Sequence, residues 1–190
     1  MPITSVETFS ISGPALLSLK RAGDERGWFC ETWNARDWKE AGLPQENWVQ
    51  DNYAFSAEIG TTRGLHFQAP PHAQAKLIQV VRGRIFDAIV DIRTGSPTYG
   101  QSVCLVLNSD QPQVFYIPAG FAHGYQTLDP DTLVYYKVTD HYAPETEGGL
   151  LWNGERSAID WPIREHVTLS KRDHDWPDLG ALKSPFTQAD

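Results

Sequence analysis

The sequence predicts an all-β fold, either a sandwich or a jelly-roll barrel with a few short helices. Short strand-like runs recur along most of the chain, and Gly, Pro, Asn or Asp closes them. Many short strands at close spacing are typical of two packed sheets or a closed barrel. The clearest predicted strands are Trp28–Trp33, Trp48–Phe55, Lys76–Val81, Ile85–Ile92, Val103–Leu107, Val114–Ile117 and Thr132–Val138.

The segment from residue 85 to 92 shows the strand period directly. Its even-numbered residues are all apolar, whereas its odd-numbered residues mix aliphatic side chains with Asp87 and Asp91. Helical signal is sparse, and the one predicted helix covers 34–42, with Asn34 as its N-cap and Gly42 ending it. From Ala143 onward the composition predicts loops and short pieces.

Length and composition favour one domain over residues 1–190, with 41% hydrophobic residues available for a core. The formal net charge of −8 disfavours a nucleic-acid binder, although a few converging Arg and Lys side chains can still hold a small anion. No apolar run approaches the length of a membrane span, and the N-terminus does not resemble a secretory signal. Cys30 and Cys104 fall in strand-like runs and are expected as buried free thiols, so a cytoplasmic location is expected.

The stretch from Arg63 to Leu77 carries the first candidate chemistry. His66 precedes a loop with two prolines, and Lys76 opens the next predicted strand. A His can act as a base near neutral pH, and a nearby cation stabilises an anion. Taken alone, however, a strand His is more often a hydrogen-bonded structural residue.

The second stretch is Ile117–Gly124, which reads Pro-x-Gly-x-x-His between two predicted strands. It resembles the second motif of the cupin superfamily, a jelly-roll barrel with its site inside. Metal-binding cupins supply His-x-His in the first motif, whereas here Gln68 stands two positions after His66. A metal triad therefore cannot be assembled from these positions, and a metal-free site is expected.

Further stretches follow the family order of a more specific resemblance. Tyr136 lies in the last predicted strand and Asp173 in the C-terminal third, where packing and turn roles are their ordinary functions. Ten segments in order nevertheless resemble the dTDP-4-dehydrorhamnose 3,5-epimerase family over nearly the whole chain. These segments are 24–31, 49–52, 63–68, 74–77, 90–100, 117–124, 136–137, 151–153, 159–162 and 169–173.

The resemblance implies a role for each matching residue. His66 matches the general base that removes a proton beside the C4 ketone, and Asp173 matches the carboxylate paired with it. Lys76 matches the cation that stabilises the enolate oxygen, and Tyr136 matches the acid on the opposite face of the sugar. The positions that match the substrate-binding set are Arg26, Glu31, Gln50, Asn52, Arg63, His123, Glu147 and Arg172.

The same resemblance implies a homodimer that acts on a dTDP-linked 4-keto-6-deoxyhexose without metal or organic cofactor. N-terminal segments of the family reach the neighbouring subunit's site, so residues near Arg26 and Glu31 are expected to serve the partner. Asp87 could orient His123, although a solvated Asp on a strand is an equal expectation. The chain departs from the family at Arg172, where many members have Lys, and in the segment 152–155, which reads Trp-Asn-Gly-Glu.

Three alternatives remain open from the residues. One is an epimerase that acts at only C3 or only C5 with the same base, Lys and Tyr. Another is a non-catalytic cupin module that binds a sugar nucleotide, which would have no need of a Tyr acid opposite a His base. The third is a metal-dependent cupin enzyme, which the missing His-x-His disfavours.

Overall fold

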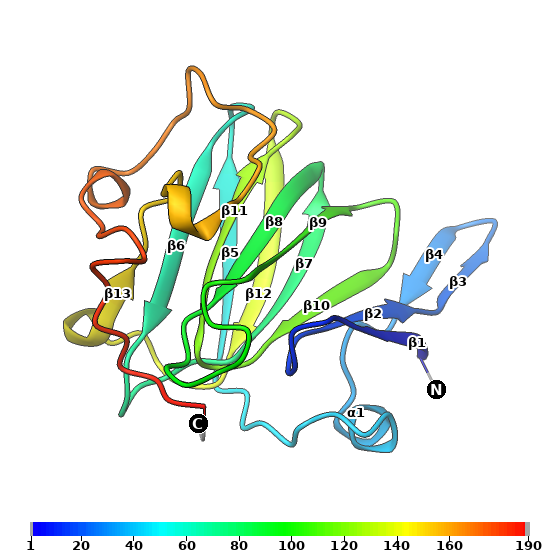
Figure 1. The fold of residues 1–190 in the computed structure, drawn as a ribbon. Coiled ribbons are helices and arrows are strands. Elements are labelled where there is room, and N and C mark those ends of the chain that lie inside the picture. Colours follow the sequence, from blue (N-terminus) through cyan, green and yellow to red (C-terminus); the bar gives the residue numbers. More distant parts are fainter. Residues whose placement is uncertain (1, 189–190) are drawn as a thin grey trace.

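The computed structural model describes residues 2–188 as two antiparallel sheets that face each other, with a separate hairpin beside them (Figure 1). The six-stranded sheet runs in the order β1 (Ile3–Thr8), β2 (Ala15–Leu19), β10 (Gln113–Ile117), β7 (Lys76–Arg82), β12 (Thr132–Val138) and β5 (Gln50–Ser56). The five-stranded sheet runs β13 (Glu147–Gly149), β6 (Thr62–Gln68), β11 (Phe121–Thr127), β8 (Arg84–Asp91) and β9 (Ser102–Asn108). The hairpin consists of β3 (Arg21–Asp24) and β4 (Gly27–Cys30).

Helices are few, as predicted. The helix α1 (Ala35–Glu40) begins after Asn34, whose side chain accepts hydrogen bonds from two backbone N–H groups of the first turn. Three single 3₁₀ turns follow, namely η1 (Pro144–Thr146), η2 (Glu155–Ser157) and η3 (Arg172–His174). Within residues 2–188, no helix is long and apolar enough to cross a membrane.

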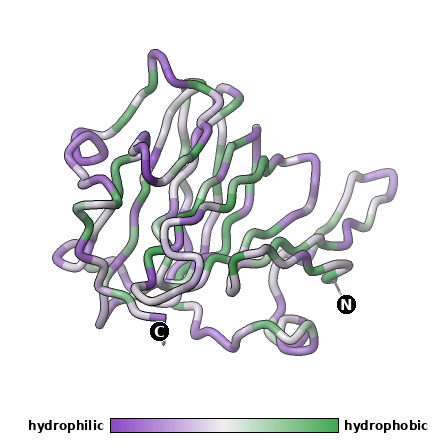
Figure 2. Tube along the Cα trace, in the orientation of Figure 1, coloured by the Kyte–Doolittle hydropathy of each residue, from purple (hydrophilic) through white to green (hydrophobic). Residues whose placement is uncertain are grey.

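The main core lies between the two sheets. It combines aliphatic and aromatic residues from both, including Ile78 and Val134 of the six-stranded sheet and Ile85, Ile89 and Phe121 of the five-stranded sheet, all nearly inaccessible. Figure 2 shows that hydrophobic residues follow the strands, whereas the outlying loops are mostly hydrophilic. The predicted all-β jelly-roll class is thus confirmed, as a sandwich of two sheets that do not close into a complete barrel.

Each sheet also has a covered outer face. The segment after β13 packs Leu150, Trp152 and Trp161 onto the outer face of the five-stranded sheet. On the other side, Trp38 of α1 packs against the outer face of the six-stranded sheet, and its ring lies edge-on to Tyr116. The C-terminal third therefore consists of loops and short pieces, as predicted, but it forms a packed third layer.

Several sequence predictions need correction. The predicted strand Trp28–Trp33 ends at Cys30, and β1, β2, β3 and β11 were not predicted as strands, so His123 lies within a strand rather than between two. Cys104 is exposed and Cys30 is half-buried, which contradicts the expectation of two buried thiols. Asp87 is fully buried, so a solvated position for this side chain is excluded.

An irregularity in β6 controls which side chains face the inter-sheet space. His66 lies opposite His123 of β11, whereas Arg63 lies opposite Tyr125, so β6 advances three residues while β11 advances two. In a regular strand, residues three apart point to opposite faces, but one extra residue puts them on the same face. Arg63 and His66 consequently line the same cleft.

Glycine at position 64 makes this irregularity possible. Gly64 has φ of +111°, and a Cβ there would lie 2.6 Å from both the Gly124 Cα and the His123 carbonyl oxygen. Neither neighbour is a flexible side chain, so both strands would have to separate.

We therefore expect Gly64→Ala to destabilise the protein by roughly 2–6 kcal/mol, because backbone strain and overpacking each cost about 1–3 kcal/mol. Gly27→Ala is the matched control: Gly27 has φ of +123°, but nothing lies within 4 Å of its added Cβ. The control should lose only the strain component, about 1–3 kcal/mol. Urea unfolding of both variants gives the comparison, and equal losses would show that the β6–β11 contact relaxes freely.

Candidate active site

A cleft of about 390 Å³ opens between the two sheets. Side chains from five strands, from η3 and from the segment before η3 line it, so both sheets and the C-terminal layer contribute. The lining residues are Ala54, Thr61, Thr62, Arg63, His66, Lys76, Ile78, His123, Tyr125, Tyr136, Thr168, Leu169, Ser170, Arg172 and Asp173. Of the twelve residues predicted for the site, seven are in this group: His66, Tyr136, Lys76, Asp173, Arg63, His123 and Arg172.

His66 and Asp173 form a hydrogen-bonded pair across 107 residues of sequence. His66 Nε2 lies 2.5 Å from Asp173 Oδ1, and the Asp173 side chain is 2% exposed while the His66 side chain is 31% exposed. Burial opposes ionisation of Asp173, but the hydrogen bond and charge of His66 outweigh it and lower the pKa of Asp173. With Nε2 held by a carboxylate, Nδ1 is the ring nitrogen available to accept a proton.

A second, more deeply buried His–Asp pair lies beside the first. His123 Nε2 is 3.0 Å from both oxygens of Asp87, and His123 is directly opposite His66 in the strand pairing. Burial raises the pKa of Asp87, and the charges of His123 and Lys76 oppose that shift. Asp87 therefore orients His123, as one of the two sequence expectations stated.

Lys76 opens β7 on the six-stranded sheet. Its side chain keeps partial contact with solvent in the cleft, yet protein atoms crowd it on most sides. This desolvation lowers the pKa of Lys76 to about 8, although the carboxylates of Asp87 and Glu147 act in the opposite direction. Lys76 is therefore still mostly cationic at neutral pH, and its charge is poorly screened.

Tyr136 faces the cleft from β12, opposite the sheet that carries His66. It pairs with Ile78 of β7 and Asn52 of β5, which puts its side chain on the inner face. Desolvation raises the pKa of Tyr136, while the Arg63 charge acts against it. The hydroxyl is therefore protonated at neutral pH and can donate its proton.

Three further predicted residues lie next to the lining. Gln50 and Asn52 share the inner face of β5, and their side chains hydrogen bond to each other at 2.7 Å. The Asn52 side-chain nitrogen is buried without a partner among the described residues. Glu147 of β13 pairs with Arg172 and accepts a 3.1 Å hydrogen bond from the Tyr142 hydroxyl.

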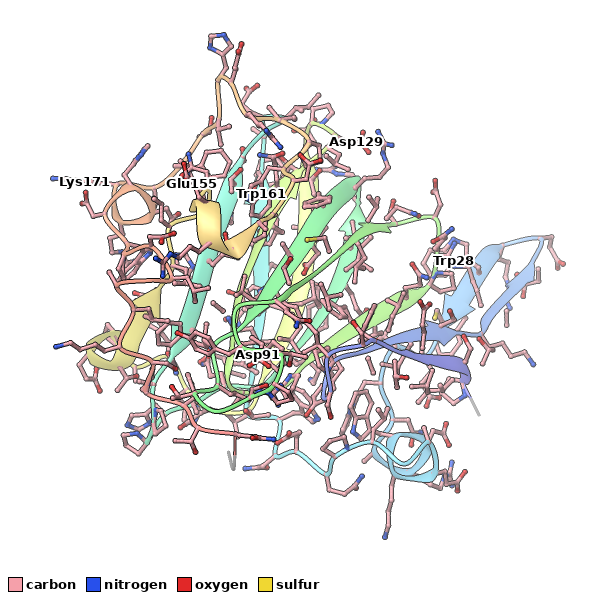
Figure 3. All side chains as sticks on the ribbon, viewed as in Figure 1. Trp28, Asp91, Asp129, Glu155, Trp161 and Lys171 are labelled. Carbon is pink, nitrogen blue, oxygen red and sulfur yellow. The ribbon has the colours of Figure 1, made fainter. Side chains whose placement is uncertain are left out.

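The structure does not bring Arg26 and Glu31 to this cleft. Arg26 lies at the tip of the β3–β4 hairpin, where its 83% exposed side chain pairs with Asp24. Figure 3 places Trp28 of that hairpin and Lys171, which precedes η3, on opposite sides of the molecule. Within one chain, neither Arg26 nor Glu31 lines the cleft that contains His66.

Gln68, at the position of the missing second His, has a structural role. Its side-chain amide donates to the carbonyl oxygens of His72 and His141, and its oxygen accepts from the Ala143 N–H. Among residues 2–188, no three His, Cys, Asp or Glu side chains are grouped so that they could hold a metal ion.

Sequence reasoning missed Tyr125 and Tyr142. Tyr125 follows His123 by two residues on β11, so a strand prediction there would have put both on one face. Tyr142 connects Gln50 and Glu147 through its backbone N–H and its hydroxyl, and no local pattern in the sequence indicated this.

Comparison with known proteins agrees with the fold. The family model described as dTDP-4-dehydrorhamnose 3,5-epimerase matches residues 8–181. A dTDP-4-dehydrorhamnose 3,5-epimerase of Sinorhizobium fredii is 42% identical over 95% of this chain and 92% of its own length.

Two solved structures are similar over nearly their whole length. The dTDP-4-dehydrorhamnose 3,5-epimerase of Bacillus anthracis with TDP and PPi bound has a TM-score of 0.88 and 42% identity, covering 92% of this chain and 98% of that one. The Legionella pneumophila dTDP-6-deoxy-D-glucose-3,5-epimerase, in complex with dTDP-4-keto-L-rhamnose, has a TM-score of 0.89 and 39% identity, covering 94% of each chain.

The fold and the cleft thus define a jelly-roll isomerase of the sugar-nucleotide type. The chain belongs to the dTDP-4-dehydrorhamnose 3,5-epimerase family.

Because the pKa of Lys76 is about 8, we expect kcat/KM to fall as the pH rises through about 8, where the cation loses its proton. Lys76→Arg keeps its charge beyond that range, so its residual activity should lack this alkaline limb. Glu147→Gln removes a charge that raises the Lys76 pKa, and it should shift the limb to lower pH. A pH–rate profile of the three proteins checks this, and an unchanged limb in Lys76→Arg would assign it to another group.

Proposed function

We propose that this chain inverts C3 and C5 of a dTDP-linked 4-keto-6-deoxyhexose by removing and returning a proton beside the C4 ketone. The observation that carries the proposal is the arrangement of the cleft: His66 lies on one sheet with Asp173 of η3 hydrogen bonded to it, Tyr136 lies on the facing sheet, and Lys76 lines the same space. A base and an acid on opposite walls fit an inversion, because the proton leaves one face of a carbon and returns to the other.

His66 begins each inversion as the base. Its Nδ1 takes the proton from the carbon next to the ketone, and the C–H electrons move into the C4–O group to give an enolate. Asp173, held at 2.5 Å from Nε2, fixes the ring and stabilises the imidazolium that forms. A positioned base of this kind contributes roughly 10²–10⁴-fold to the rate.

Lys76 stabilises the enolate oxygen. The negative charge appears only as the proton leaves, so an ammonium group beside that oxygen binds the transition state more strongly than the substrate. The crowding that lowers the pKa of Lys76 also strengthens this interaction, because less water screens the charge.

Tyr136 completes the inversion by giving its hydroxyl proton to the same carbon from the opposite face. His66 then carries an extra proton and Tyr136 lacks one, and exchange with solvent restores both. The ketone accepts the electrons throughout, so no metal or organic cofactor enters the scheme. Arg63 and Arg172 at the cleft suit the diphosphate, since a guanidinium binds phosphate oxygens in a planar, bidentate manner.

The roles of His66 and Tyr136 predict different isotope behaviour in heavy water. His66→Asn should abolish both deuterium uptake and product formation, because no enolate forms. Tyr136→Phe keeps the base, so it should exchange deuterium into the substrate faster than it forms inverted product.

Proton NMR of dTDP-4-keto-6-deoxyglucose with each variant measures both rates and shows whether C3, C5 or both exchange. Exchange at one carbon only would favour a single-centre epimerase, and binding without exchange in the native protein would favour a non-catalytic module. Equal loss of exchange and inversion in Tyr136→Phe would contradict its role as the acid. Prior treatment with a chelator should leave all rates unchanged.

A homodimer belongs to the same proposal, with a cytoplasmic location expected. The β3–β4 hairpin extends away from the two sheets (Figure 1) and exposes Trp28 (62%) and Phe29 (70%), apolar residues suited to a protein contact. The hairpin of each subunit would carry Arg26 to the partner's cleft, where it would hold the diphosphate together with Arg63.

Complementation between two inactive variants tests this arrangement. Arg26→Ala and His66→Asn should each be impaired, but a mixed dimer contains one cleft with native His66 and a native Arg26 from the partner. Random subunit exchange should therefore restore about a quarter of the native activity, since half the dimers are mixed and each has one complete site. If the activity of the mixture after subunit exchange equals its activity before exchange, Arg26 does not act across subunits.

A further inference from the structure

We propose that the hydroxyl of Tyr125 is a specificity-determining contact that hydrogen bonds to an oxygen of the substrate's pyranose ring or its hydroxyls. This inference rests on the proposed function, because it takes the occupant of the cleft to be a sugar nucleotide. Tyr125 lines the cleft from β11 and is 5% exposed. Its hydroxyl oxygen is fully buried, yet it has no hydrogen-bond partner among residues 2–188.

A buried hydroxyl without a partner is unusual, because leaving such a group unsatisfied costs free energy that folding must offset. The polar groups nearest to Tyr125 are engaged elsewhere. Asp87, its partner in the β11–β8 pairing, directs both carboxylate oxygens to His123. The Ser56 hydroxyl lies near enough to lower the pKa of Tyr125, but the two hydroxyls do not reach hydrogen-bond geometry, and the Ser56 oxygen accepts the Arg63 Nε–H at 3.4 Å.

The neighbourhood of Tyr125 indicates a neutral oxygen as its ligand. Burial raises the pKa of Tyr125, so its hydroxyl is protonated and able to donate. The Arg63 charge is near enough to act against the rise in the Tyr125 pKa, but the Arg63 side chain is exposed at the cleft, whereas Tyr125 is buried beside His123. A diphosphate belongs with the exposed guanidinium, and the sugar occupies the deeper space that Tyr125 reaches.

Tyr125→Phe removes the hydroxyl and leaves the ring. We expect the free energy of unfolding to be unchanged or higher, because an unsatisfied polar group is removed from the interior. Affinity for dTDP should be unchanged, whereas affinity for the unreactive probe dTDP-glucose should fall about three- to ten-fold, the range of one hydrogen bond. Calorimetry measures both ligands, and kcat/KM for the 4-keto sugar should fall at least as much as dTDP-glucose affinity.

Tyr116→Phe is the matched control. Tyr116 is as deeply buried, but its hydroxyl donates to Glu46 at 2.8 Å and lies outside the cleft lining. This control should lower stability without changing the affinity for either ligand.

Other results would overturn the role of Tyr125 or, separately, the proposed function. A loss of stability in Tyr125→Phe with unchanged dTDP-glucose affinity would make the hydroxyl structural, with Ser56 as its partner. An equal loss of affinity for dTDP and dTDP-glucose would place the contact on the nucleotide. If the native protein binds dTDP-glucose but does not epimerise the keto sugar, the proposed function fails while the binding comparison still decides the role of Tyr125.

Discussion

The close approach of β6 and β11 is the constraint on which the site depends. Gly64 and Gly124 face each other there, and a Cβ on either would lie within 2.7 Å of backbone atoms of the opposite strand. The extra residue accommodated at this point turns Arg63 and His66 to the same side. In a regular strand, residues 63 and 66 would point to opposite faces, so only one of the two side chains would lie in the cleft.

The two His–Asp pairs at the cleft, His66–Asp173 and His123–Asp87, differ in how far the His side chain is exposed. His123 and Asp87 are almost inaccessible, at 7% and 0% side-chain exposure, and they help form the wall beside Lys76. His66 keeps a partly open edge while its carboxylate partner is buried. A base needs one face free for substrate and a rigid support behind it, and of these two pairs the His66–Asp173 pair fits both conditions of the proposed role.

Sequence patterns predicted strand bounds best where a strand has apolar residues on at least one face and clear turn residues at its ends. The bounds of β12 were predicted correctly, and β8 to within one residue at each end, because aliphatic, aromatic and β-branched residues together make up most of both strands. The strand β1 was missed because five of its six residues are exposed, and β11 because Gly124 and small side chains weaken its strand signal. Cys104 was misassigned because β9 lies at a sheet edge, which exposes one of its faces.

The residues of the site, like the strands, were predicted only in part from the sequence. Family order identified seven residues that line the cleft. Neither the β6 irregularity nor the unpartnered Tyr125 hydroxyl has a local signature, since both arise from contacts between strands.

The carboxylate that pairs with His66 comes from Asp173, close to the C-terminal end of the described residues. The twelve described strands before residue 139 are synthesised before η3, so a nascent chain can pair the strands that carry His66, Lys76 and Tyr136 while His66 still lacks its carboxylate. Enzymatic competence would then follow tertiary folding as a separate, later event, when the C-terminal layer docks onto the five-stranded sheet.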